Sequence, residues 1–244
     1  MQIYLWAERQ KLRRSNIVWL AVFATVMVAL IVFLGGQEVY DGSRYIDKAG
    51  WYMTMMQTWA TFFVLPAVIA LLGSYLICRE EQDDTIKALR LIPINEVKLT
   101  AAKMMITFMF SVLIYLLLFV ITFSVEAMLH FSDLSVGMVL DFLKAYFLEG
   151  LGVFLAISPI VALVAHMKKS YWLALVITEM YSFAGIFMSM SNTLQTYYPI
   201  TAIFGISGYY EASTSRVFFS CLSLLFCGGL SVFILKSLKH SEKS

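Results

Sequence analysis

The sequence predicts an all-α integral membrane protein with six transmembrane helices in a single domain, residues 1–244. The mean hydropathy is +0.79, and only 14% of the residues are charged, whereas about 25% is usual in a soluble domain. The apolar residues also gather in six segments of about the 20 residues that a helix needs to cross the hydrocarbon core. The predicted spans cover residues 16–36, 52–78, 100–126, 140–165, 170–191 and 216–236.

The N-terminal residues 1–15 change from apolar and aromatic to basic. Tyr4 and Trp6 suit the headgroup level of a bilayer, while Arg9 and Arg13 suit anionic lipid phosphates. We therefore expect an interfacial helix on the inner leaflet before the first span. The alternative is a solvated basic tail. The first apolar run is longer than the 7–15 residues of a cleaved signal peptide.

The basic residues predict the orientation, because short loops rich in Lys and Arg resist translocation. Fourteen of them fall on the side of the two termini and four on the other side. Both termini are therefore expected in the cytoplasm, with loops 36–50 and 192–215 outside. The fourteen are Arg9, Lys11, Arg13, Arg14, Arg79, Lys87, Arg90, Lys98, Lys103, Lys168, Lys169, Lys236, Lys239 and Lys243, and the four are Arg44, Lys48, Lys144 and Arg216.

Two features break the regular pattern of spans. Pro66 lies inside the second span, followed by the small residues Ala67, Ala70, Gly73 and Ser74. Small residues let another helix approach closely, either within the chain or between copies. Before the last span, residues 200–208 form an uncharged segment too short to cross, with tyrosines on both sides. We expect a short outer segment that is either re-entrant or lies on the surface.

Acidic residues near or inside the spans are candidates for function. Glu179 lies about 12 Å from the inner edge of the fifth span by helical rise, near the midplane. It is either a substrate or proton site or a packing residue. Glu126 and Glu149 lie about 28–34 Å from their inner lysines, so we expect both at the outer interface and in contact with water.

The sequence offers little that could support enzyme chemistry. It has no P-loop motif, and His130, His166 and His240 show no metal-ligand spacing. The three cysteines form no Cys-x-x-Cys pair, and buried free thiols are the expected state. We predict no catalytic residue, no metal site, no cofactor bound by this chain and no nucleic-acid partner.

The segment CREEQDDTIKALRLIPINEVK, residues 78–98, is the most polar part of the chain. Asp83 and Asp84 are suitable N-cap residues, and Pro93 ends a helix. The pattern predicts a capped helix of about eight residues, 84–92, in the one sizeable cytoplasmic loop. A rigid helix of this kind is typical of a docking element for a cytoplasmic partner.

The run from Glu81 to Leu89, followed by Pro93, Ile94 and Lys103, resembles the cytoplasmic loop of ABC-2 type exporter permeases. The glycine usual before the threonine is Asp84 here. The resemblance implies that residues 84–93 form the coupling helix, seated on a separate ABC ATPase subunit that binds ATP-Mg. The implied coupling residues are Glu81, Asp84, Thr85, Ile86, Leu89, Arg90 and Pro93.

The N-terminal run AERQKLRRS, residues 7–15, resembles the lantibiotic-protection and bacitracin-resistance branch of these permeases. That branch implies export of a membrane-active peptide antibiotic from a bacterial cell membrane, with a second permease copy or a sibling permease as partner. Two alternatives remain: a proton-coupled secondary transporter that uses Glu179, and a non-transporting anchor or sensor subunit. An ATPase gene beside this one would favour the first hypothesis.

Overall fold

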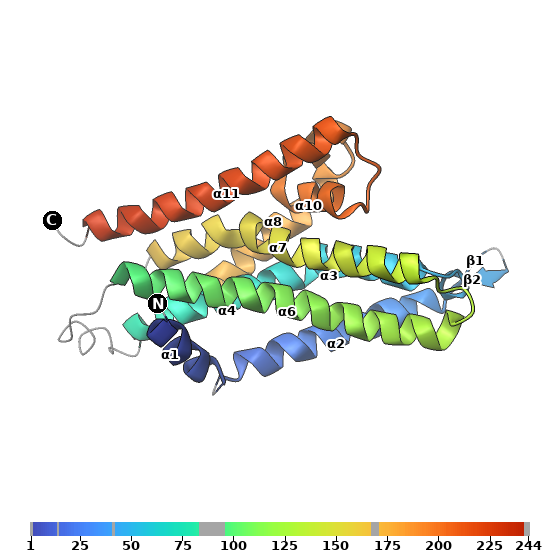
Figure 1. Ribbon diagram of the computed structural model, residues 1–244, viewed down its shortest axis with the longest axis horizontal. Coiled ribbons are helices and arrows are strands. Elements are labelled where there is room, and N and C mark those ends of the chain that lie inside the picture. Colours follow the sequence, from blue (N-terminus) through green and yellow to red (C-terminus); the bar gives the residue numbers. More distant parts are fainter. Residues whose placement is uncertain (1, 14, 41, 83–95, 167–170, 242–244) are drawn as a thin grey trace.

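The computed structural model describes residues 2–13, 15–40, 42–82, 96–166 and 171–241. It is a bundle of long helices in which α2 and α11 lie on opposite sides, with α4, α6 and α7 between them (Figure 1). The helices are α1 (Gln2–Arg13), α2 (Ile17–Gly36), α3 (Trp51–Phe63), α4 (Leu65–Gln82), α6 (Glu96–His130), α7 (Val136–His166), α8 (Trp172–Met188), α9 (Asn192–Tyr197), α10 (Pro199–Ser207) and α11 (Thr214–Ser241). A hairpin of β1 (Val39–Tyr40) and β2 (Ser43–Arg44) and a 3₁₀ turn, η1 (Tyr45–Asp47), follow α2.

Four of the described helices are long and apolar enough to cross a membrane: α2, α6, α7 and α11. The pair α3 and α4 would make a fifth span, bent by 45° at Val64. Helix α8 is apolar but has only 17 residues, about 26 Å of helix. The described residues therefore bear out a multi-pass α-helical membrane protein, with four or five spans by length and composition, whereas the sixth predicted span remains a prediction.

Two prolines shape the bundle differently. Pro66 is the second residue of α4, where its missing N–H is tolerated, and the chain breaks just before it. Pro159 lies inside α7 and removes the usual donor to the carbonyl of Leu155. The hydroxyl of Ser158 donates to that same carbonyl at 2.9 Å, so α7 continues through the proline.

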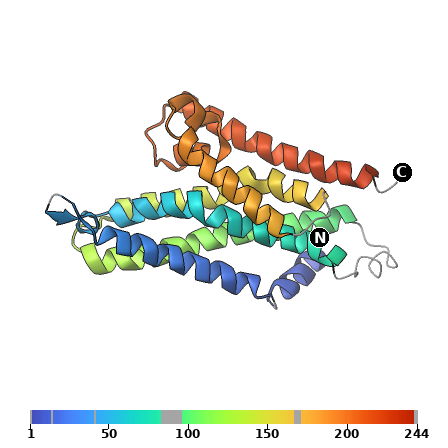
Figure 2. The same cartoon turned by 180° about the vertical axis from the view of Figure 1, so that it is seen from behind.

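Different elements lie at the two ends of the bundle (Figure 1). Helix α1, the C-terminal part of α11 and the ends of α4 and α6 that flank residues 83–95 lie at one end (Figures 1 and 2). The β1–β2 hairpin lies at the other end, called the hairpin end below. The termini therefore lie on the same side, as the charge pattern requires, while the identity of that side as cytoplasmic remains a prediction.

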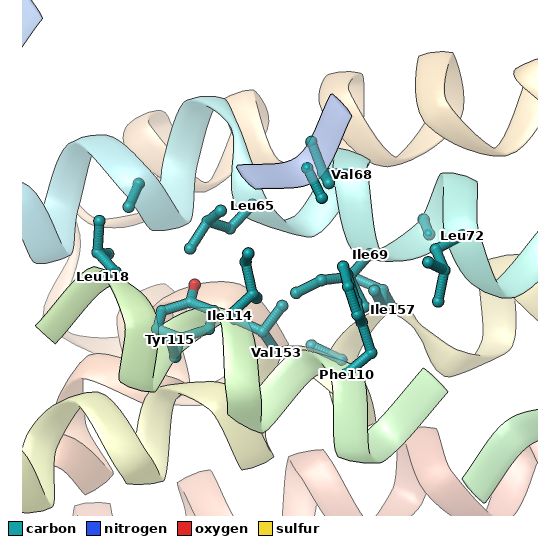
Figure 3. Packing of buried hydrophobic residues seen from close by; sticks show 14 of the residues in the cluster. Leu65, Val68, Ile69, Leu72, Phe110, Ile114, Tyr115, Leu118, Val153 and Ile157 are labelled. Carbon is teal, nitrogen blue, oxygen red and sulfur yellow. The ribbon is translucent and has the colours of Figure 1, made fainter. Parts of the chain in front are cut away.

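The core forms where α4, α6 and α7 meet. Figure 3 shows the buried side chains of the three helices interdigitating: Leu65, Val68, Ile69 and Leu72 from α4, Phe110, Ile114, Tyr115 and Leu118 from α6, and Val153 and Ile157 from α7. A Cβ on Gly73 would lie 2.9 Å from Cγ2 of Thr107 and 3.1 Å from Cγ1 of Val161. The small residues of α4 thus serve close packing within this chain.

The outer surfaces of α2 and α11 carry large exposed apolar side chains, including Trp19, Phe23, Phe226 and Phe233. Single exposed apolar residues are ordinary on soluble proteins, but continuous apolar helix faces of this kind suit contact with lipid. The segment before α11 instead turns inward, because Ile200, Ile203 and Phe204 of α10 are buried against α7, α8 and α11.

Candidate functional site

The predicted coupling helix, residues 84–92 with Asp84, Thr85, Ile86, Leu89 and Arg90, lies outside the described residues, as does Pro93. Glu81 lies in the last turn of α4. The roles of these residues therefore remain predictions. What the structure describes is how the two helices that flank the segment are held.

Helices α4 and α6 are joined close to the segment by a buried lysine. The ammonium of Lys103 donates a hydrogen bond of 2.6 Å to the carbonyl oxygen of Leu76, two turns of helix before α4 ends. Lys103 is the lysine that the sequence resemblance included. A charged donor in a buried setting forms a strong hydrogen bond, so the contact ties the two flanking helices together.

Helix α1 packs against α6 at the same end. Glu8 is buried and accepts a hydrogen bond of 2.9 Å from Lys11, while Ile3 and Trp6 are exposed. A charged face toward protein and an apolar face outward are compatible with the predicted position at the membrane surface.

Glu179 lies near the middle of α8, half-buried, and its Oε2 has no hydrogen-bond partner among the described residues. The neighbouring hydroxyls of Thr178 and Ser182 are fully buried and also lack partners within the described chain. The arrangement is compatible with a substrate or proton site and with a packing residue, the two roles predicted for Glu179.

A second acid, Glu149 of α7, is fully buried, which the sequence analysis did not expect. Neither of its carboxyl oxygens has a hydrogen-bond partner among the described residues. It lies beside the phenols of Tyr115 on α6 and Tyr146 on α7 and near the hydroxyl of Ser207 on α10. Helix α3 is the fourth helix around Glu149, because Thr61 and Met53 of α3 contact the hydroxyls of Tyr115 and Tyr146.

Polar groups of these helices converge around Glu149, and we call this set the Glu149 cluster: Gln57, Thr61, Tyr115, Tyr146, Glu149 and Ser207. The hydroxyls of Thr61 and Tyr115 are 2.8 Å apart, and the hydroxyl of Tyr146 donates to the carbonyl of Met53 at 2.8 Å. Gln57 is four residues after Met53 on α3, and Glu149 is three residues after Tyr146 on α7. Each therefore lies about one helical turn beyond the contact between Met53 and Tyr146, at the same depth in the bundle. The amide nitrogen of Gln57 is buried without a partner in the described chain.

The cluster lies midway along the two longest helices. Tyr115 is twelve residues from Lys103 and fifteen from His130, about 18 and 22 Å along α6. Next to Glu149, a Cβ on Gly150 would lie 3.0 Å from Cα of Val112, and Ser111 donates to the carbonyl of Gly150 at 2.7 Å. The glycine brings the backbones of α6 and α7 together and so excludes water from the acid beside it.

A third acid, Glu126, is also fully buried, at the hairpin end of α6. Its Oε1 accepts hydrogen bonds from the backbone N–H of Gly50 at 2.6 Å and from Nδ1 of His130 at 3.0 Å. Nε2 of His130 lies 3.1 Å from the carbonyl of Asp47. This set, called the Glu126 network, fastens η1 and the start of α3 to α6.

The Glu126 network continues outward through the hairpin. Asp47 forms an ion pair of 2.9 Å with Arg44, which in turn donates to Gln37 at 3.1 Å. Hydrogen bonds from the Arg44 side chain and backbone lower the pKa of the Asp47 carboxyl, with smaller contributions from the charges of Arg44 and His130. The ion pair and hydrogen bonds of Arg44 thus hold the loop after α2, and His130 connects this loop to Glu126.

The expectation that Glu126 and Glu149 are in contact with water is wrong, because both are fully buried. Glu149 also lies midway along α7, whereas it was expected at the outer interface. Counting residues along one helix gives depth, but burial depends on which helices lie beside the side chain. Spacing in the sequence carried a usable signal, because Gln57 and Thr61, and likewise Ser111 and Tyr115, are four residues apart and share a helix face. Two polar faces in apolar helices predict a polar interior.

The sequence matches the family model described as ABC-2 family transporter protein over residues 4–185. The matched region runs from α1 to most of α8 and contains Lys103, the Glu149 cluster except Ser207, and the whole Glu126 network. No curated protein and no solved structure matches the chain.

Proposed function

The chain belongs to the ABC-2 family of transporter proteins, and from this membership we propose that it is the permease subunit of an ATP-driven exporter. A permease of this family is a membrane component of an ABC transporter and is not itself the catalyst. The family also implies an ATPase partner. The observation that carries the proposal is the family match over three quarters of the chain.

In the proposed mechanism, two permeases, either two copies or two siblings, pair with two cytoplasmic ATPases. The permeases lie in a bacterial cell membrane with both termini inside. When ATP-Mg binds, the ATPases move and displace the coupling helices, residues 84–93. The hydrogen bond from Lys103 to Leu76 supports this mechanism. Two helices joined at their inner ends transmit a push on the loop between them as a movement of both.

The proposed substrate is a membrane-active peptide antibiotic, lantibiotic or bacitracin-like, whose export gives immunity or resistance. The support is the resemblance of residues 7–15 to that branch. Glu179 is the proposed contact for the substrate or a proton. Glu179→Gln should then lose protection while expression and ATPase assembly stay normal, whereas normal protection would assign Glu179 to packing.

Substitution of Leu89 by Asp tests the coupling role. A fully covered leucine contributes about 1.5–3 kcal/mol, and about 1.4 kcal/mol corresponds to a factor of ten in affinity. We expect Leu89→Asp to weaken association with the ATPase by more than tenfold, measured by co-purification in mild detergent. Glu81→Ala should leave association intact and reduce export per ATP hydrolysed.

Lys103→Met is the comparison variant that separates binding of the ATPase from coupling. It removes the tie between α4 and α6 without altering the loop, so the ATPase should still bind while its turnover no longer drives export. Leu89→Asp that co-purifies at wild-type yield and fully protects cells would reduce the loop to a connector and contradict the proposal.

A further inference from the structure

Among the described acids, Glu149 combines full burial with the lack of a hydrogen-bond partner for either carboxyl oxygen. It is fully buried midway along α7, and both of its carboxyl oxygens lack a hydrogen bond from any described residue. An ionised carboxylate in such a place loses its hydration and gains nothing in return, so a buried acid of this kind takes up a proton instead.

The hydroxyls around Glu149 are already engaged elsewhere. Tyr146 donates to the carbonyl of Met53 and Ser207 to the carbonyl of Phe204, at 2.8 and 3.3 Å. The hydroxyl of Tyr115 is bonded to that of Thr61 at 2.8 Å. Tyr146 and Ser207 therefore donate to backbone carbonyls, and Tyr115 and Thr61 share one hydrogen bond in which either hydroxyl can be the donor.

No described residue supplies a compensating charge. The groups that face Glu149 are the phenols of Tyr115 from α6 and Tyr146 from its own helix and the hydroxyl of Ser207 from α10, and no described cation contributes to its electrostatics. From α3, the polar groups at this level are Thr61 and Gln57, an alcohol and an amide. All of these groups are uncharged near neutral pH.

We propose that Glu149 is a proton-binding site, which holds a proton while α3, α6, α7 and α10 are packed together and releases it only when these helices separate and admit water. The close contacts of α7 explain why separation is needed. A Cβ on Gly152, one turn from Glu149, would lie 2.9 Å from Ile203 of α10. The site is distinct from Glu179 and does not depend on the identity of the exported substrate.

Glu126 provides a matched internal control. It is as buried as Glu149, but its Oε1 accepts hydrogen bonds from the Gly50 N–H and from His130, while its Oε2 has no partner among the described residues. Donors of this kind favour the ionised form of a carboxyl. The two glutamates therefore differ in the donors around them although they do not differ in exposure.

Infrared spectroscopy of the full-length protein in nanodiscs tests the proposal, because a protonated carboxyl has its own C=O stretching band, which shifts in D₂O. At pH 7 we expect Glu149→Gln to remove such a band and Glu126→Gln to leave it in place. Glu179→Gln identifies any contribution from α8. A Glu149→Gln spectrum identical to that of the wild type in this region would overturn the proposal.

Labelling provides a second measurement. Dicyclohexylcarbodiimide reacts with protonated carboxyls in apolar surroundings, and mass spectrometry of peptides locates the adduct. We expect several-fold more adduct at Glu149 than at Glu126 in nanodiscs, where the helices stay packed and Glu149 holds its proton. Equal labelling of the two would contradict the proposal. Neither measurement needs the ATPase, so failure of the Leu89→Asp test and failure of this proposal are distinguishable.

Discussion

Glu126 and Glu149 are equally buried, yet the structure surrounds them in opposite ways. At the hairpin end, Glu126 has a backbone N–H and an imidazole directed at one oxygen. In the middle of the bundle, Glu149 has hydroxyls that are bonded to other groups. Burial alone therefore does not fix the state of an acid, because the orientation of the donors decides whether a charge is stabilised.

The largest effect is expected from Glu126→Ala. The substitution leaves the buried N–H of Gly50 and the partly buried ring of His130 without their acceptor, at a cost of about 3 kcal/mol in the free energy of unfolding. Reversible unfolding in mixed detergent micelles measures it. Glu126→Gln keeps an acceptor and should cost clearly less. If both variants are as stable as the wild type, the Glu126 network does not stabilise the fold.

Gly50→Ala should come next. Gly50 has φ of +81°, and a Cβ there would collide with the side-chain end of Met138. The left-handed conformation alone costs about 1–2 kcal/mol for a residue with a Cβ, and the collision adds to it. Gly42→Ala is the control, since φ is +83° but no atom lies within 4 Å of the added Cβ. If both variants lose equal stability in the same unfolding assay, the contact with Met138 is unimportant.

A smaller effect is expected from removal of the hydroxyl of Tyr115. Tyr115→Phe breaks the bond to Thr61 and should cost about 1 kcal/mol of unfolding free energy. Thr61→Val should cost a similar amount, and the double variant less than the sum of the two, because the partners share one interaction. Strict additivity in this cycle would mean that the two hydroxyls are not coupled.

Below about pH 4, Glu149→Gln should change stability little, within about 0.5 kcal/mol, because the glutamate is then neutral in both the folded and the unfolded state and the amide has the same shape. As the pH rises above the unfolded pKa of a glutamate, the variant should become the more stable of the two. The folding of the wild type must then take up a proton that the unfolded glutamate has lost, so its stability falls with pH. A large loss at pH 7 would instead indicate an ionised Glu149.

The smallest effect belongs to Asp47→Asn in the exposed part of the Glu126 network. Arg44 lowers the pKa of Asp47, so its contribution to stability is present above the unfolded pKa and is lost as pH falls through the folded value. Thermal unfolding between pH 3 and 7, in steps, should therefore show a shallower acid limb in the variant. An unchanged acid limb would place the stabilising contact of Asp47 elsewhere.

Much of the fold could be predicted from the sequence, because a long apolar segment in lipid must form a helix to satisfy its own backbone. The helices at residues 17–36, 96–130, 136–166 and 214–241 follow from this rule. The break before Pro66 was expected only as a tolerated irregularity. Whether a proline kinks or interrupts a helix depends on the donors nearby, and Ser158 supplies one beside Pro159 but no matching hydroxyl adjoins Pro66.

The polar interior could be predicted only in part. Glu179 is half-buried in the middle of its helix, as counting along the span suggested, whereas the buried positions of Glu126 and Glu149 depend on contacts with α3 and α10 that no single segment encodes. The hydrogen bond from Lys103 to Leu76 is of the same kind. The coupling residues, Glu81 and 84–93, are still known from sequence alone.

The length of α6 has a mechanical consequence. Its 35 residues form one unbroken rod of about 52 Å, attached to α4 through Lys103 near one end and to the start of α3 through Glu126 near the other. Between these attachments it crosses α7 at Gly150, backbone against backbone. If the rod pivots at this central contact, a sideways displacement of the Lys103 end moves the hairpin end in the opposite direction by a comparable distance.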